Sequence, residues 1–166
     1  MTTLQVPTTA RLAFRVYVNP LPQPRVKATG RVAGGRVISR VYTPSKVKGR
    51  SLKEFKERVR VVAEAAVRAH PSWQKSRALR TWCRFYIEPP ASLLTSRGRL
   101  RKGSRRRPTG ARDGDGDNLE KGVLDTLKGI VHADDSLIVS WGGEKHWALG
   151  EQLPCVEVEV YDEGAL

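Results

Sequence analysis

An acidic stretch within a strongly basic chain constrains the fold more than any other feature of this sequence. Asp and Gly alternate from Asp113 to Asp117, the stretch ends at Lys121, and an Asp134-Asp135 pair follows, in a chain of formal net charge +13. Neighbouring carboxylates repel one another unless a cation shares their site. Asp oxygens suit Mg²⁺ or Mn²⁺, and a basic protein that holds such an ion is suited to phosphodiester hydrolysis. The pattern therefore indicates a metal-dependent nuclease.

Length and charge bound the class of protein. The 166 residues are enough to bury a core without disulfides. Charged residues make up 28% of the chain, and the basic excess is spread over several segments, which favours a polyanionic partner such as nucleic acid. We find no internal repeat and no linker between two cores, so the sequence predicts one domain over residues 1–166.

Neither a membrane protein nor a zinc protein is indicated. No apolar run is long enough to span a bilayer, and Met1 to Thr9 lacks the layout of a secretory signal, so we expect a soluble, cytoplasmic protein that uses no membrane. Cys83 and Cys155 lie in apolar, strand-like contexts without metal-ligand spacing. They are predicted to be buried free thiols.

The N-terminal half predicts a strand, a basic ribbon and a helix. Leu12 to Val18 is rich in β-branched and aromatic residues and is followed by a Pro-rich turn over 19–24. A basic, Gly-punctuated stretch over 25–50 can pair across Gly34-Gly35 as a hairpin. Apolar residues then recur at helical spacing, which predicts an amphipathic helix from Ser51 to Ala69.

The centre of the chain predicts a second main strand and a mobile insertion. Arg80 to Glu88 alternates apolar and polar side chains and is closed by two prolines. The segment 92–112 holds eight basic residues and no large apolar side chain after Leu100. Such a segment cannot bury a core of its own, so we expect a mobile, Arg-rich insertion within the domain.

The acidic stretch is predicted to enter a helix over Asp117 to Leu127. Asp117 suits the N-cap, and Glu120 three residues later completes a capping-box pattern. At about 100° per residue, apolar residues share one face and Asp117 and Lys121 share the opposite one. Beyond Asp135, the pattern predicts a strand over 137–141 and a last strand over 155–161, which we place towards an edge of the sheet.

Two simpler interpretations of the acidic stretch compete with that of a nuclease. Alternating Asp and Gly is good turn chemistry, and Asp117 alone is explained as a helix cap. An EF-hand calcium loop is the second alternative, but Asn118 stands where that loop needs Gly and Leu124 where it needs Glu. The combination of carboxylates entering a helix, a Lys one turn later and a second acidic pair favours the nuclease.

At these residues the sequence resembles the RusA family of Holliday junction resolvases. The family pattern is Asp-x-Asp-Asn entering a helix, a Lys one turn later, Asp-x-Leu, a connection with Gly, and Asp-Asp leading into a strand that ends near a Lys. It is matched here from Asp115 through Lys121, Asp125 and Asp135 to Lys145. A looser likeness extends to the Pro-rich turn and the helix after it.

The resemblance implies a fold, a reaction and a set of site residues. The fold would be α/β (α+β), a single two-layer domain with a mixed β-sheet packed by helices, acting as a homodimer. Mg²⁺, or Mn²⁺ as a substitute, would be its metal, with no small-molecule cofactor, and the substrate would be branched DNA, a four-way junction cut by paired symmetric nicks. Asp115, Asp117 and Asp135 would bind the metal, with Asp134 and Asp113 as additional candidates. Lys121 would be the cationic catalytic residue.

Other residues are assigned more general roles. DNA contacts are expected from the basic residues Arg105, Arg106, Arg107, Arg112, Lys145 and Arg25. His132 lies near the acidic pair, yet a lone loop His is more often solvated than catalytic. Trp82, Trp141 and Trp147 suit base stacking, although packing is the commoner use of Trp. The alternative to a resolvase of bacterial or phage origin is a non-enzymatic basic nucleic-acid-binding protein.

Overall fold

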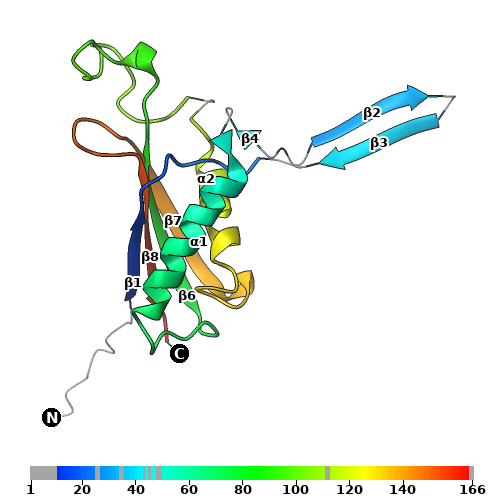
Figure 1. The fold of residues 1–166 in the computed structure, drawn as a ribbon, viewed down its shortest axis with the longest axis vertical. Coiled ribbons are helices and arrows are strands. Elements are labelled where there is room, and N and C mark those ends of the chain that lie inside the picture. The colour runs from blue at the N-terminus through cyan, green and yellow to red at the C-terminus, as the bar shows by residue number, and fades with distance from the viewer. Residues whose placement is uncertain are drawn as a thin grey trace.

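The computed structural model of the chain describes residues 11–24, 27–33, 36–42, 44, 46–47, 50–110 and 113–164. Its body is a four-stranded sheet with two helices against one face (Figure 1). The predicted α+β class with a mixed sheet is confirmed. No helix among the described residues is long and apolar enough to cross a membrane.

The sheet is built from β1 (Arg11–Val16), β6 (Leu79–Ile87), β7 (Ile138–Trp147) and β8 (Cys155–Asp162), in the order β1-β8-β6-β7. The β1–β8 and β8–β6 pairs are antiparallel and the β6–β7 pair is parallel. Burial alternates along β6 and β8, as a sheet with one covered face requires. Cys83 and Cys155 are buried free thiols, as predicted.

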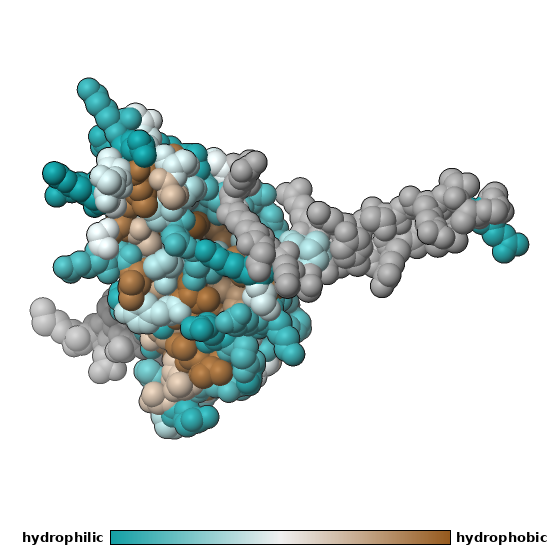
Figure 2. All heavy atoms as spheres, turned by 45° about the horizontal axis from the view of Figure 1, so that its top comes forward, coloured by the Kyte–Doolittle hydropathy of each residue, from teal (hydrophilic) through white to brown (hydrophobic). Residues whose placement is uncertain are grey.

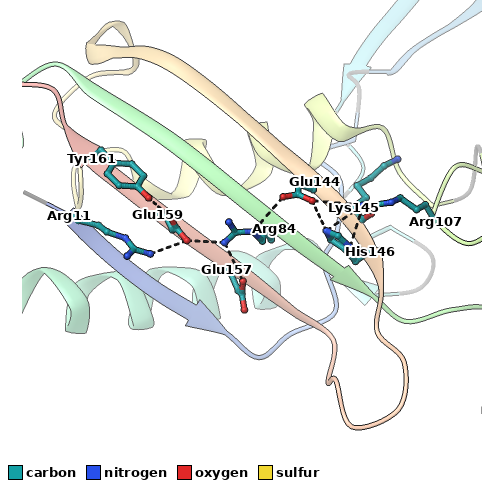
Figure 3. A network of polar contacts seen from close by, with 9 residues as sticks. All are labelled: Arg11, Arg84, Arg107, Glu144, Lys145, His146, Glu157, Glu159 and Tyr161. Atoms are coloured by element: carbon teal, nitrogen blue, oxygen red, sulfur yellow. Dashed lines mark hydrogen bonds and ion pairs between the residues drawn. The ribbon is translucent and has the colours of Figure 1, made fainter. Parts of the chain in front are cut away.

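The prediction that the last strand lies towards an edge is wrong, because β8 pairs with β1 on one side and β6 on the other. Its acidic side chains are neutralised by cations from both neighbours. Glu159 contacts Arg84 at 2.8 Å and Arg11 at 3.0 Å, and Glu157 pairs with Arg15. Figure 3 shows Arg11, Arg84 and the two glutamates of this network on the face of the sheet away from the helices. A central strand therefore carries charges on its solvent-facing side.

Helix α1 (Leu52–Arg68) covers the sheet as the sequence predicts. Ser51 is its N-cap, and the Ser51 hydroxyl accepts a hydrogen bond from the Glu54 backbone N–H at 3.2 Å. Phe55 and Val59 are buried against the sheet. The apolar stripe of α1 thus forms one side of the core, which Phe85, Val158, Leu119 and Val123 complete.

Helix α2 (Gly116–Leu127) packs against α1 and β7. Its N-cap is Asp115, so the predicted capping box between Asp117 and Glu120 is wrong. Asp117 lies inside the first turn, where a carboxylate is stabilised by the helix dipole. Glu120 is 8% exposed, because the earlier start of the helix turns it towards the body of the protein.

Two short antiparallel pairs complete the described structure. Strands β2 (Lys27–Ala33) and β3 (Arg36–Tyr42) form the predicted hairpin, which extends away from the sheet (Figure 1). Strands β4 (Lys46–Val47) and β5 (Arg50–Ser51) pair just before α1. Most side chains of this region, Arg25 included, lie outside the described residues.

Candidate active site and nucleic-acid interface

An open pocket of about 310 Å³ lies between α2 and the start of β7. It brings together three residues that the sequence predicts to be functional, namely Asp117, Lys121 and Asp135. The remaining lining residues are Glu120, Leu124, Asp125, Ile138 and Trp141. Helix α2 and the chain from Asp135 into β7 therefore supply all of the lining.

Helix α2 positions its polar residues by simple periodicity. Leu119, Val123 and Leu127 are fully buried on its core side, whereas Asp117 and Lys121, four residues apart, are exposed on the pocket side. The charged residues are therefore held by a rigid element whose other face is locked in the core. This arrangement suits a site that must fix charges relative to one another.

The chain enters α2 through a tight turn. Gly114 has φ +91°, and a Cβ there would lie 3.2 Å from Cγ of Pro22, so the turn requires glycine. The Lys145 ammonium donates to the Gly114 carbonyl at 2.8 Å. Asp115 follows directly, and its carboxylate accepts a hydrogen bond from Asn118 at 3.4 Å. Asp115 thus lies at the N-terminus of the helix, next to the pocket lining rather than within it.

Asp135 begins the short 3₁₀ helix η2 (Asp135–Leu137), and two neighbours hold its carboxylate. His132 Nε2 is 3.0 Å from one oxygen and Lys128 Nζ is 3.5 Å from the other. Lys128 also contacts Asp134 at 2.8 Å, and this hydrogen bond lowers the pKa of Asp134 and raises that of Lys128. Contrary to the expectation of a solvated side chain, His132 is 1% exposed. Its place is that of a group that orients Asp135.

A comparison with protein families agrees with this site. The family model described as Endodeoxyribonuclease RusA matches residues 18–161, which include α1, α2, the pocket and most of the sheet. The chain belongs to the RusA endodeoxyribonuclease family. Members of this family are endonucleases that bind branched DNA and act on Holliday junctions. No curated protein matches the chain significantly.

In this RusA family member Asp113 is built into the fold. Asp113 is 4% exposed, both of its oxygens contact Arg105 Nη2 at 3.0–3.1 Å, and it accepts a hydrogen bond from the Gly110 N–H at 2.7 Å. The backbone carbonyl of Arg105 in turn accepts from Trp147 Nε1 at 3.0 Å. Both residues are therefore engaged in anchoring the Arg-rich segment, and neither is placed like a free metal ligand or phosphate contact.

Asp113→Asn is expected to lower the free energy of unfolding by about 1–3 kcal/mol, because it leaves a charged partner without its carboxylate. It should also loosen the segment between Leu100 and Gly110. Urea unfolding measures the first effect, and limited proteolysis measures the second. Arg106→Ala is the matched control, since Arg106 is exposed on the same segment. Equal stability and equal proteolysis of the Asn variant would contradict the anchoring role.

The other predicted DNA contacts occupy varied positions. Arg106 and Arg107 are exposed, and Arg107 Nη1 lies 3.3 Å from the Lys145 carbonyl and 3.9 Å from Glu144 (Figure 3). Lys145 is partly buried, and its ammonium donates a hydrogen bond to the Gly114 carbonyl. Arg112 and Arg25 lie outside the described residues. The segment 92–110 makes several contacts with the body, and its mobility in solution stays a prediction.

The tryptophans divide between packing and exposure. Trp147 is 5% exposed and packs in the core, whereas Trp141 is 66% exposed at the rim of the pocket. Val139, also on β7, is exposed as well. Figure 2 shows hydrophobic residues reaching one face of the molecule in patches separated by hydrophilic ones. An exposed Trp beside an acidic pocket is suited to stacking on an unpaired base.

Glu120 is a pocket residue that the sequence interpretation missed. It was assigned to a helix cap, although its position between the core face and the polar face of α2 places it beside Lys121. Burial raises the pKa of the Glu120 carboxyl, and a backbone hydrogen bond from Gly142 opposes that effect. The signal in the sequence was the i, i+3 spacing from Asp117, which was interpreted only as a capping pattern.

The donor set of the pocket suits a hard divalent cation. Carboxylates of Asp117, Glu120 and Asp135 line it, and Oε1 of Glu120 is buried without a hydrogen-bond partner. Within the described ranges, no three or more His, Cys, Asp and Glu side chains stand together closely enough to form a metal-binding group. Asp117 and Asp135 are both exposed to solvent, so an ion can reach their oxygens from outside.

Proposed function

We propose that the protein is a Mg²⁺-dependent endonuclease, with Mn²⁺ as a substitute, that resolves four-way DNA junctions by paired symmetric nicks. One observation carries the proposal: Asp117, Lys121 and Asp135 line a single open pocket in a chain of net charge +13. Carboxylates for a cation, a Lys for phosphate and a basic surface for DNA are the parts that phosphodiester hydrolysis needs.

Each residue in this site has a distinct proposed role. Asp117 and Asp135, with Asp115 at the helix N-terminus, would hold the cation. When bound, a divalent ion supplies Lewis-acid stabilisation of the phosphate and lowers the pKa of a coordinated water. Lys121 stabilises charge that develops on the phosphate oxygens. His132 orients Asp135, and Lys128 neutralises the acidic pair while DNA approaches.

A non-enzymatic nucleic-acid-binding protein is the competing function. Such a protein gains nothing from exposed carboxylates beside its polyanionic ligand, because they repel phosphate. The deciding experiment incubates the purified protein with a synthetic four-way junction, with Mg²⁺ and with a chelator. Paired nicks only in Mg²⁺ support the resolvase, whereas binding without nicks in any divalent metal supports the alternative. A linear duplex of the same sequence controls for structure selectivity.

We further propose that the protein acts as a homodimer in a bacterial or phage-infected cytoplasm, during recombination, repair or phage DNA processing. A four-way junction has two equivalent strands to cut, so one dimer with two pockets matches its two-fold symmetry. The Arg-rich segment 92–112 is proposed to be an insertion within the single domain. The ion pair between Arg105 and Asp113 attaches this segment to the start of the turn before α2. Other basic side chains of the segment, such as Arg106 and Arg107, are exposed to solvent.

Arg106→Ala is expected to weaken binding to junction and to linear duplex alike, because an interaction with phosphate is blind to base identity. The slope of log K against log salt should fall by up to about 0.9, since one fewer phosphate is neutralised by the protein. A salt titration of both DNA forms makes the measurement, with Arg60→Ala on α1 as the control for charge alone. An unchanged slope would remove Arg106 from the DNA-binding surface.

A further inference from the structure

Glu120 is a buried carboxylate with one satisfied and one unsatisfied oxygen. Its side chain lies on α2 and lines the same pocket as Asp117 and Asp135, with 8% of the residue exposed. The carboxylate accepts a backbone hydrogen bond from Gly142 of β7. Its Oε1 atom is buried and has no hydrogen-bond partner. A buried acceptor without a partner is destabilising, so this oxygen calls for an explanation.

The neighbouring strand β7 lies against this carboxylate. Gly142 presents its backbone N–H to Glu120, and a Cβ at this position would lie 2.6 Å from Cζ3 of Trp82 on β6. A side chain at this position would therefore force the Trp82 ring to move. Glu120 therefore lies against β7 and lines the pocket, and its Oε1 is buried without a hydrogen-bond partner.

No cationic side chain among the described residues forms an ion pair with Glu120. Lys121, its neighbour in sequence, also lines the pocket but does not contact it as an ion pair. The exposed acidic pair Asp134 and Asp135, by contrast, shares an ion pair with Lys128. Of the pocket carboxylates that stand in no ion pair within the described residues, namely Asp117, Glu120 and Asp125, Glu120 is the buried one.

We propose that Glu120 is a further ligand of the divalent cation, contributing Oε1 from the wall of the pocket beside Asp117 and Asp135. The proposal rests on the proposed function, because it concerns the same cation. A bound ion would satisfy the unpartnered oxygen and compensate the charge, and a Glu one turn after Asp117 faces the same side of α2. The exposed aspartates would then close on the ion from the solvent side.

The competing explanation is that Glu120 is a neutral, structural acid whose only role is its hydrogen bond with the strand. Burial favours that protonated form in the absence of a cation. Glu120→Gln separates the two explanations. Gln keeps the shape and the acceptor for Gly142 but is a poor ligand for Mg²⁺ or Mn²⁺, so a structural role survives the change and a ligand role does not.

The test is direct binding of Mn²⁺ to the full-length protein without DNA, monitored by calorimetry and by loss of the free-ion electron paramagnetic resonance signal. Glu120→Gln is expected to weaken Mn²⁺ binding by about tenfold or more. Asp117→Asn is the positive comparison, and Glu151→Gln, an exposed loop carboxylate, is the matched control and should bind as the parent does. Thermal unfolding without metal checks that each variant is folded.

The outcomes separate this inference from the function on which it rests. If Asp117→Asn loses Mn²⁺ and Glu120→Gln binds it like the parent protein, Glu120 is not a ligand while the proposed function stands. If the parent protein binds no Mn²⁺, both ideas fail. Should Glu120→Gln not fold, Glu120→Asp keeps the charge but withdraws the oxygen by one methylene, and unchanged Mn²⁺ affinity in that variant would equally overturn the proposal.

Discussion

Asp117→Asn is expected to abolish cleavage of a four-way junction while junction binding is kept or becomes tighter. The substitution removes the charge of a proposed metal ligand, so the step that would need the cation should be lost. It also removes a negative charge that repels phosphate at the pocket, so affinity does not fall with activity. Asp117 is exposed in the first turn of α2, and the isosteric change leaves the core untouched.

Cleavage is measured under single-turnover conditions in Mg²⁺, and binding is measured with a chelator. Asp135→Asn should behave like Asp117→Asn, whereas Glu151→Gln should cut as the parent does. Normal cleavage by the Asp117 variant would remove the centre of the proposed mechanism. Parallel loss of binding and cleavage would instead indicate that the residue supports DNA docking.

Lys121→Ala is expected to lower the cleavage rate roughly tenfold to a thousandfold, with little change in junction affinity. The reason is that a cation placed at the phosphate stabilises charge that appears only in the transition state. Lys121 follows Asp117 by one turn and lines the same pocket, so removing its ammonium changes the electrostatics at the reacting phosphate. Its exposed side chain contributes nothing to the buried core.

For Lys121→Ala and the parent protein, we would compare the single-turnover cleavage rate and the equilibrium dissociation constant for the same junction. Lys53→Ala on α1 removes an exposed cation away from the pocket and should leave the cleavage rate unchanged. If affinity and rate decreased by the same factor, Lys121 would be a general phosphate contact. A rate within about twofold of the parent would exclude it from the chemistry altogether, because removing one electrostatic interaction with the transition state costs far more.

Local patterns predicted most of the elements well. Helix α1 was predicted over Ser51 to Ala69 and spans Leu52–Arg68, because a long amphipathic repeat with a Ser cap leaves few alternatives. The alternation along β6 and the basic hairpin were also confirmed. The strand into β7 was predicted over 137–141 but continues to Trp147, since its parallel pairing with β6 supplies hydrogen bonds that no local pattern records.

The sequence-based predictions were wrong where contacts between residues far apart in the chain determine the structure. The Glu residues of β8 indicated an edge strand, and only the arginines of β1 and β6 make a central position acceptable. The start of α2 depends on the turn at Gly114 and on Lys145 from β7. The N-cap is therefore Asp115, two residues before the predicted Asp117. The same long-range packing buries His132 beside Asp135 and Glu120 beside Gly142. Motif spacing selected the residues of the pocket, but the surroundings of each came from the fold.

Lys128 contacts both Asp134 and Asp135, so a cation of the chain itself already lies beside this acidic pair. The Lys128 ammonium offsets part of the repulsion between these two carboxylates without a metal ion, so we expect the loop to keep its shape in a metal-free buffer. This differs from small zinc modules, in which the ion is needed for folding itself. Under the proposed function, the ion would then bind to a protein that has already folded.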